Sequence, residues 1–226
     1  MAPPPDAALA ALLAHARALV GVRLGDLADD LGLPVPTGGL RTKGWAGQII
    51  EHELGVETGG ARGPDFAALA IELKTVPVDA QLGPRESTAV CQIDPVAIAG
   101  ESWETSYARR KLARVLFVAL EVPPDARSPA DRSVAAVRLW SPSADEDTLL
   151  RADFTMFVRD FFRRGRAAAI TGQLGHVLQV RPKGRNAADQ RDGYDERGQP
   201  VRVGKHGFYL RPAFVASILR AAAGPL

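Results

Sequence analysis

The stretch "GPDFAALAIELKT", residues 63–75, joins a Gly-Pro turn signal, a short apolar run and three charged side chains. Asp65 follows the turn, and Glu72 and Lys74 lie near the end of the stretch with Leu73 between them. Because side chains alternate between the two faces of an extended strand, Glu72 and Lys74 share one face and Leu73 faces the core. The stretch therefore predicts a charged site on a β-strand whose other face is buried.

A bend near Ala70 would bring the Asp65 carboxylate beside that of Glu72. Two carboxylates at a strand edge form a hard-oxygen site for Mg²⁺, which binds through one or two carboxylates and takes water and phosphate oxygens at its remaining positions. The Lys74 ammonium, near a metal-bound water, can stabilise a hydroxide nucleophile or, if its pKa is lowered, help to remove the proton. This is the layout that phosphodiester hydrolysis requires.

The same three side chains also fit an interpretation without catalysis. Glu72 and Lys74 would then be solvated on an exposed strand face, and Asp65 would cap a turn. On the catalytic interpretation, replacing any of the three by alanine abolishes cleavage and leaves folding nearly unchanged, since surface charges contribute little to a core.

The segment "KGWAGQIIEHELG", residues 43–55, predicts a helix that carries a candidate third acid. Its apolar residues recur at helical spacing, and Gly55 supplies a stop signal. Glu51 lies beside this apolar stripe, from which its carboxylate could reach the pair formed by Asp65 and Glu72. The alternative is an ordinary acid on the surface of the helix.

Length and composition limit the class of protein. With 226 residues, of which 46% are hydrophobic, the chain can bury a proper core as one large domain or two small lobes. Its single cysteine, Cys91, excludes an intramolecular disulfide and a Cys-rich metal framework, and a cytoplasmic location is expected. No run reaches the roughly 18 uncharged apolar residues that a membrane span requires, so no membrane association is predicted.

Charge is unevenly distributed along the chain, although the net charge is only +2. Residues 1–60 hold four Lys/Arg against seven Asp/Glu, whereas residues 159–211 hold twelve against five. This asymmetry indicates a carboxy-terminal half that offers a positive face to a polyanion, although a solvated surface would give the same counts. The polar segment 184–205 is predicted as a long functional loop that orders on a phosphate backbone.

The remaining periodicities predict alternating helices and strands without an internal repeat. Helices are expected at about 6–20, 24–31, 44–54, 143–165 and 212–222. Strands are expected at about 65–69, 70–76, 87–93, 112–120, 133–140, 176–182 and 206–210.

Taken together, these segments resemble the MutH family of bacterial mismatch-repair endonucleases. The resemblance covers roughly residues 9–222 and rests on segments that follow the order and nearly the spacing of the family: "KGWAGQIIEHELG", "PDFAALAIELKTVPVD", "WETSYARRKLARVLF", "LWSP", "LQVRPK" and "GFYLRPAF". It implies a restriction-endonuclease-like α/β fold with a PD-(D/E)xK core, in which a mixed sheet is flanked by helices and two lobes form a DNA cleft. Residues 1–226 would form a single domain, with a catalytic core at about 43–140 and a DNA-reading region at about 141–226.

The resemblance also implies roles for individual residues in a Mg²⁺-dependent active site. Asp65 and Glu72 match the metal-binding acids, Lys74 matches the lysine of the signature, and Glu51 matches the helix-borne acid that completes the site. Lys111 matches a further active-site lysine. For this last residue, a solvated charge is the alternative.

A second group of matches implies contacts with DNA. Lys43 precedes Gly-Trp where the family has a lysine near the DNA backbone, with a solvated charge again the alternative. Arg181, Pro182 and Lys183 match the base-reading segment, and Tyr209 matches the aromatic residue associated with sensing adenine methylation. The alternative for Tyr209 is an aromatic residue packed within the protein.

The function implied by the resemblance is methyl-directed mismatch repair. Family members nick the unmethylated strand of double-stranded DNA at hemimethylated or unmethylated GATC sites, and MutL activates them after MutS has found a mispair. A monomer is expected because one nick needs one active site. Two alternatives stay open: a type II restriction enzyme that cuts both strands at GATC, and a non-catalytic DNA-binding repair module. Ala89 departs from the family, which has a phenylalanine there that is thought to touch DNA.

Overall fold

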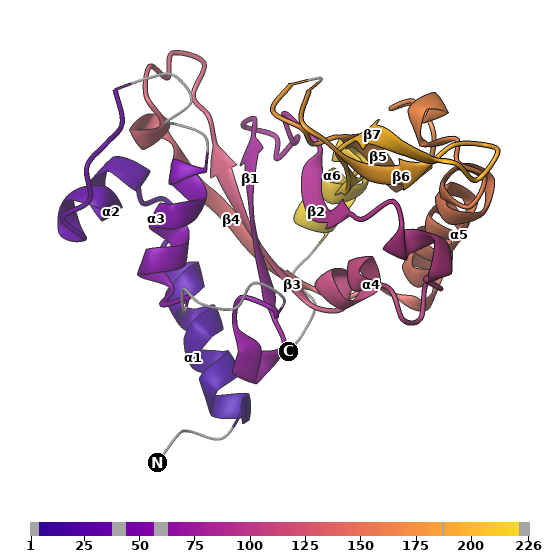
Figure 1. Cartoon of the computed structure of the whole chain (residues 1–226). Helices are drawn as coiled ribbons and strands as arrows, with labels where there is room; N and C mark the ends of the chain where they lie inside the picture. The colour runs from indigo at the N-terminus through magenta and orange to yellow at the C-terminus, as the bar shows by residue number, and fades with distance from the viewer. Residues whose placement is uncertain (1–4, 38–43, 57–62, 187, 222–226) are drawn as a thin grey trace. The chain divides into compact units, whose positions relative to one another are not determined.

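The computed structural model describes residues 5–37, 44–56, 63–186 and 188–221, and they divide into two compact units (Figure 1). The first unit takes the chain up to Glu86, the segment Arg114–Ser141 and the chain from Val215 onward. The second takes Ser87–Ala113 and Pro142–Phe214. Each unit therefore combines segments that are distant in the sequence.

The first unit is built on a mixed three-stranded sheet of order β1-β3-β4. β1 (Glu72–Val78) pairs in parallel with β3 (Val115–Glu121), which pairs antiparallel with β4 (Ser133–Trp140). The six apolar residues of β3 are all buried, as expected of a central strand that is covered on both faces. The α/β class and the mixed sheet predicted from the sequence are confirmed.

Three helices of this unit are α1 (Pro5–Ala18), α2 (Leu24–Asp30), which packs on the third helix, and α3 (Trp45–Glu53). α3 packs on β1 and α1 on β4 (Figure 1). Their shared core includes Leu13, Leu24 and Ile50, each at most 2% exposed. The helical spacing of apolar residues predicted these elements, because such spacing places one continuous stripe against a sheet.

The second unit contains an antiparallel sheet of order β2-β8-β5. Its strands are β2 (Thr88–Ile93), β8 (His206–Leu210) and β5 (Leu178–Pro182). α5 (Ala144–Phe157) covers one face of this sheet, because the rings of Phe154 and Phe157 lie with their centroids 5.4 and 6.3 Å from that of Phe208. The opposite face carries the polar side chains described below.

The predicted loop at 184–205 is wrong, because its central part forms a β-hairpin. β6 (Gln190–Tyr194) pairs antiparallel with β7 (Pro200–Gly204). At the turn, Asp195 Oδ1 accepts hydrogen bonds from the N–H groups of Arg197 and Gln199, and Gly198 adopts φ 73°. Backbone pairing forms this ladder although seven of its ten residues are exposed, so it has no buried hydrophobic face that the sequence pattern could reveal.

Other differences concern short or irregular elements. The strand expected at 65–69 is wrong, because Ala67–Leu69 form a 3₁₀ turn. The helix expected at 143–165 ends its α-helical part at Phe157 and continues as a π-helical segment. A helix not predicted from the sequence, α4 (Tyr107–Leu112), is capped by Ser106, whose Oγ accepts a hydrogen bond from Arg109 N. The remaining elements are 3₁₀ turns at Ala97–Gly100, Pro129–Asp131 and Ala167–Ala169, the π-helical Val158–Phe162, and α6 (Pro212–Arg220).

Across the described ranges, the helices are too short or too polar to cross a membrane.

Candidate active site and nucleic-acid interface

The bend predicted near Ala70 is confirmed and places Asp65 beside the start of β1. Phe66 and Ile71 form an isolated antiparallel bridge, with N···O distances of 2.9 and 3.2 Å between their backbones. Ala70 closes the bend with φ 52°. Across the bridge, Asp65 Oδ2 accepts a hydrogen bond of 2.7 Å from Leu73 N. The turn thus holds the Asp65 carboxylate against the backbone of Leu73, the residue between Glu72 and Lys74.

Glu72 and Lys74 form an ion pair on one side of β1, as the strand spacing predicted. Lys74 Nζ lies 2.6 Å from Glu72 Oε1. The Glu72 residue is only 4% exposed, so the interpretation of a solvated strand face is wrong for this carboxylate. Burial of a carboxylate is costly unless charge and hydrogen bonds compensate it, and the Lys74 ammonium supplies such compensation.

Glu51 comes to the same region from α3. Gly47, one helical turn before Glu51, marks the side of α3 that faces β1. A Cβ added to Gly47 would lie 3.4 Å from Thr75 Oγ1, on β1, and 3.8 Å from Glu51 Oε1. The Glu51 carboxylate therefore turns toward β1. Burial raises the pKa of Glu51 above its ordinary value, and the negative charge of Asp65 raises it further, while Lys74 opposes the shift. The helix-borne acid therefore shares the electrostatic environment of the carboxylate pair.

The Asp65 and Glu72 carboxylates offer hard oxygen donors of the kind that a divalent cation binds. Three carboxylates, from Glu51, Asp65 and Glu72, share a region in which Lys74 supplies positive charge, and after burial it is the negative charge of Asp65 that most raises the pKa of Glu51. In the part of the chain that the structure describes, no three His, Cys, Asp or Glu side chains are arranged as a metal cage. Hard oxygen donors with few protein ligands are the environment that Mg²⁺ takes when water and phosphate complete its coordination.

Two further lysines were predicted to have roles, Lys111 in the active site and Lys43 at the DNA backbone. Lys111 lies on α4 of the second unit, with its ammonium 5.7 Å from the centroid of the Tyr107 ring. Lys43 lies outside the described residues. The catalytic role of Lys111 and the DNA-backbone role of Lys43 stay predictions.

The predicted base-reading residues Arg181 and Pro182 end β5 on opposite faces of the sheet β2-β8-β5, because Pro182 pairs with His206, on the same face as Phe208. Arg181 pairs with Gly207, and Gln179 with Tyr209, so these side chains share the face opposite Phe208. Arg181 and Pro182 are exposed at the end of β5, and Lys183 directly follows them.

Lys183 and Tyr209 are in direct contact on this face. The Lys183 ammonium lies 5.7 Å from the centroid of the Tyr209 ring, within range of a cation–π interaction. Ala89 on β2 pairs with Tyr209 from the other side. A side chain predicted to read bases therefore lies beside the one predicted to sense the methyl group.

Two polar residues that sequence reasoning missed support Arg181. Gln179 is 4% exposed, and its Nε2 donates to Ser87 Oγ at 2.6 Å. The same hydroxyl oxygen accepts from Arg181 NH1 at 3.0 Å. Strand periodicity could have placed Gln179 and Arg181 on one face, but no local pattern connects them with a serine 94 residues from Arg181.

Asp153 supports the start of the same strand from α5. This carboxylate is 2% exposed, and its Oδ2 accepts hydrogen bonds of 2.8 Å from the N–H groups of His176, Val177 and Leu178. Several charge-assisted bonds compensate the burial of Asp153. They also fix the backbone of β5 just before it reaches Gln179 and Arg181.

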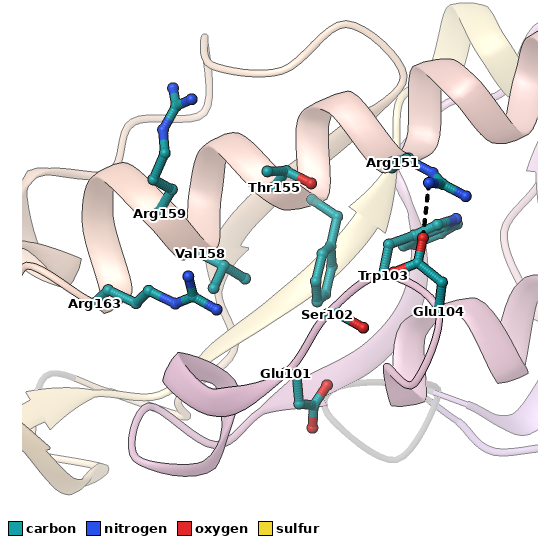
Figure 2. Close-up of a pocket in the computed structure, with 10 residues that line it drawn as sticks. Glu101, Ser102, Trp103, Glu104, Arg151, Thr155, Val158, Arg159 and Arg163 are labelled. Atoms are coloured by element: carbon teal, nitrogen blue, oxygen red, sulfur yellow. Dashed lines mark ion pairs between the residues drawn. The ribbon is translucent and has the colours of Figure 1, made fainter.

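A separate pocket of about 250 Å³ lies in the second unit beside α5 (Figure 2). Its charged lining is largely paired within the protein, since Arg151 NH1 lies 2.8 Å from Glu104 Oε1 and Arg163 Nε donates to Ala99 O. Its lining contains none of the residues predicted for catalysis or DNA reading: Glu101, Ser102, Trp103, Glu104, Arg151, Phe154, Thr155, Val158, Arg159 and Arg163.

Comparison with known proteins gives a consistent result. The family model described as DNA mismatch repair enzyme MutH matches residues 54–153. The DNA mismatch repair protein MutH of Salmonella typhimurium (strain LT2) is 43% identical over 216 residues, which cover 95% of this chain and 92% of the relative. The proteins of the same name from Salmonella newport (strain SL254) and Salmonella typhi have the same identity and coverage.

Proposed function

This chain belongs to the MutH family of DNA mismatch repair enzymes, and from this membership we propose that it is a Mg²⁺-dependent endonuclease that nicks double-stranded DNA at GATC sites. The observation that carries the proposal is the arrangement at the start of β1. There, Asp65 is held on Leu73 N at 2.7 Å, and Glu72 is paired with Lys74 at 2.6 Å.

In this proposal Asp65 and Glu72 hold the cation, and Glu51 adds negative charge that strengthens its binding. When bound, Mg²⁺ would neutralise charge that develops on the phosphate and make its bound water more acidic. Lys74 lies on the same side of β1 as Glu72, so its ammonium is placed to orient the attacking water and to stabilise negative charge at the nucleophile. Lys111 would supply a second cation near the phosphate.

The segment Arg181, Pro182 and Lys183, together with Tyr209, would read the site in the major groove. A guanidinium or ammonium group can donate to guanine O6 and N7, and the adenine N6 amino group also faces this groove. Methylation of N6 removes a donor hydrogen and adds bulk, which gives Tyr209 a physical difference to detect. Lys43 would contact the DNA backbone.

The proposed biological role is cleavage of the unmethylated strand at hemimethylated or unmethylated GATC sites, activated by MutL after MutS has recognised a mispair. Membership of a mismatch-repair family and 43% identity over nearly the whole chain support this role. The enzyme would act as a monomer, because one nick requires one copy of the Asp65–Glu72–Lys74 site.

The test is cleavage of a supercoiled plasmid that carries GATC sites in unmethylated, hemimethylated or fully methylated form. Each is incubated with Mg²⁺ or EDTA, with and without MutL, and a plasmid lacking GATC serves as the control. The expected result is nicking that requires Mg²⁺ and GATC, increases with MutL and is blocked by full methylation. Rapid double-strand cleavage without MutL would instead identify a restriction enzyme, and DNA binding without cleavage would identify a non-catalytic module.

A further inference from the structure

Ser87, which directly precedes β2, joins a buried amide to an exposed guanidinium. Its Oγ accepts hydrogen bonds from Gln179 Nε2 at 2.6 Å and from Arg181 NH1 at 3.0 Å. Gln179 is buried, whereas Arg181 is exposed. The contact therefore links the interior of the second unit to the side chain that is proposed to read bases.

The Ser87 hydroxyl oxygen can transmit the fixed position of Gln179 to Arg181. A serine hydroxyl has two acceptor lone pairs, and here Gln179 and Arg181 each donate to it. The Gln179 amide is held by its burial, so it restricts the position of the hydroxyl oxygen. That oxygen then restricts Arg181, a long side chain that would otherwise lose considerable rotamer freedom on binding.

One hydrogen bond to Ser87 leaves Arg181 able to recognise a base. The guanidinium carries five N–H donors, and a bidentate contact with guanine O6 and N7 uses two of them. A side chain that is already oriented pays less ordering entropy when it binds. Orientation by Ser87 would therefore increase discrimination at one base pair rather than general affinity for DNA.

We propose that Ser87 is a positioning residue that sets base specificity by holding Arg181 in its reading orientation. This inference rests on the proposed role of Arg181 in reading GATC. Ser87 acts through Arg181 and makes no contact with DNA of its own in this scheme.

The test compares Ser87→Thr, which keeps the hydroxyl, with the nearly isosteric Ser87→Val, which removes it. Binding is measured in EDTA to a duplex with one GATC site and to a duplex in which one G·C pair of the site is replaced by A·T. Ser87→Val should reduce the ratio of the two affinities about fivefold to tenfold, and Ser87→Thr should preserve it. Affinity for a duplex without any related site should stay the same for both.

Two further variants separate positioning from direct contact and from misfolding. In an Arg181→Ala background, Ser87→Val should change the ratio less than about twofold, because independent sites add and coupled sites do not. The double variant Ser87→Ala with Gln179→Met removes both hydrogen-bonding groups and leaves no buried amide unpaired. It should fold and lose discrimination as Ser87→Val does.

The outcomes distinguish failure of the inference from failure of the proposed function. If Arg181→Ala leaves the ratio unchanged, Arg181 does not read the site, and both the base-reading role and the inference are overturned. If Arg181→Ala lowers the ratio but Ser87→Val behaves like Ser87→Thr, only the inference on Ser87 is overturned. A loss with Ser87→Val that persists in the Arg181→Ala background also overturns it.

Discussion

Asp65 accepts a hydrogen bond through Oδ2 from the backbone N–H of Leu73, at 2.7 Å, across the bend that Ala70 closes. Leu73 lies between Glu72 and Lys74 in the sequence, and its N–H group also holds the Asp65 carboxylate. The turn and the strand are thereby locked into one geometry. A carboxylate in this position serves both the fold and the proposed chemistry, and substitutions can separate the two roles.

Asp65→Asn should separate them, because asparagine keeps an oxygen acceptor for Leu73 N but loses the negative charge. Cleavage of the GATC plasmid should fall about a hundredfold or more, since the proposed metal site loses one of its two acids. The melting temperature should stay close to that of the parent. Asp65→Ala, which also removes the acceptor, serves as the comparison and should be less stable than Asp65→Asn. An Asp65→Asn protein that cleaves normally would exclude Asp65 from the site.

Lys74→Ala should reduce stability as well as activity, in contrast to the expectation from sequence that folding would be nearly unchanged. The substitution removes the ammonium at 2.6 Å from a carboxylate in a residue only 4% exposed. Loss of a hydrogen bond to a buried charged group should cost about 1.5 to 3 kcal/mol in the free energy of unfolding.

Denaturant unfolding of Lys74→Ala, and of the double variant Glu72→Gln with Lys74→Met, measures this effect. The double variant removes both charges and should recover much of the stability while staying inactive. Equal stability of Lys74→Ala and the parent would mean that the ion pair contributes nothing to the fold.

Glu51→Gln should change the dependence of stability on pH. Burial and the charge of Asp65 raise the pKa of Glu51 above 4.5, so the folded state binds this proton more tightly than the unfolded state. The free energy of unfolding of the parent, relative to that of Glu51→Gln, should therefore fall as the pH rises from about 4.5 through the raised pKa of Glu51. Above that pKa it should stay lower. Unfolding free energies measured for both proteins between pH 4 and 8 test this. A parent that gains stability relative to the variant over this range would reverse the sign and refute the assignment.

Gly207→Ala should disturb the contact between Lys183 and Tyr209. A Cβ at this position would lie 2.9 Å from Lys183 Cδ and 3.2 Å from Tyr209 Cε2, and 2.9 Å from the carbonyl oxygen of Cys91. The flexible lysine stem can move, but the backbone oxygen cannot move cheaply, so stability should fall by about 1 to 3 kcal/mol. Discrimination between GATC and altered sites should fall as well.

Gly204→Ala is the matched control for this substitution, because a Cβ there has no other atom within 4 Å. Thermal unfolding and affinity for GATC duplexes should distinguish the two alanine variants. Matching values for both would show that the space at Gly207 has no role in placing Lys183.

Tyr209→Phe should alter methyl discrimination more than turnover of unmethylated DNA. The substitution keeps the ring on which Lys183 lies, at 5.7 Å from ammonium to centroid, and removes only the hydroxyl group. Nicking rates on unmethylated and fully methylated duplexes provide the ratio to compare with that of the parent. Equal losses on both substrates would remove Tyr209 from the sensing role.

Local spacing predicted those features of the candidate active site that depend on neighbouring residues. The shared side of Glu72 and Lys74 follows from strand geometry alone, whereas the bend at Ala70 was only a condition for bringing Asp65 close. Burial of Glu72 did not follow, because alternation says which side chains share a face and not whether both faces are covered. In β1, Glu72 and Leu73 are both buried although they point in opposite directions.

Contacts between distant segments escaped sequence reasoning altogether. Two examples depend on how three separate segments assemble. Ser87 Oγ accepts a hydrogen bond from Arg181, and the Asp153 carboxylate accepts hydrogen bonds from the backbone at the start of β5. The β6–β7 hairpin escaped for another reason: its pairing comes from backbone hydrogen bonds, while its polar side chains resemble those of a loop. Binary patterns detect burial, and these features are defined by hydrogen bonding.

The division of the first unit among three separate stretches of chain also affects how the protein can be synthesised and dissected. During translation, β1 emerges first and must wait for its neighbour β3, while the intervening Ser87–Ala113 belongs to the other unit. A fragment ending at Ala113 would contain Asp65, Glu72 and Lys74 but not the strand that pairs with theirs. The unit that carries the proposed catalytic site is thus contiguous in space but not along the polypeptide, and truncation at either end removes part of its core.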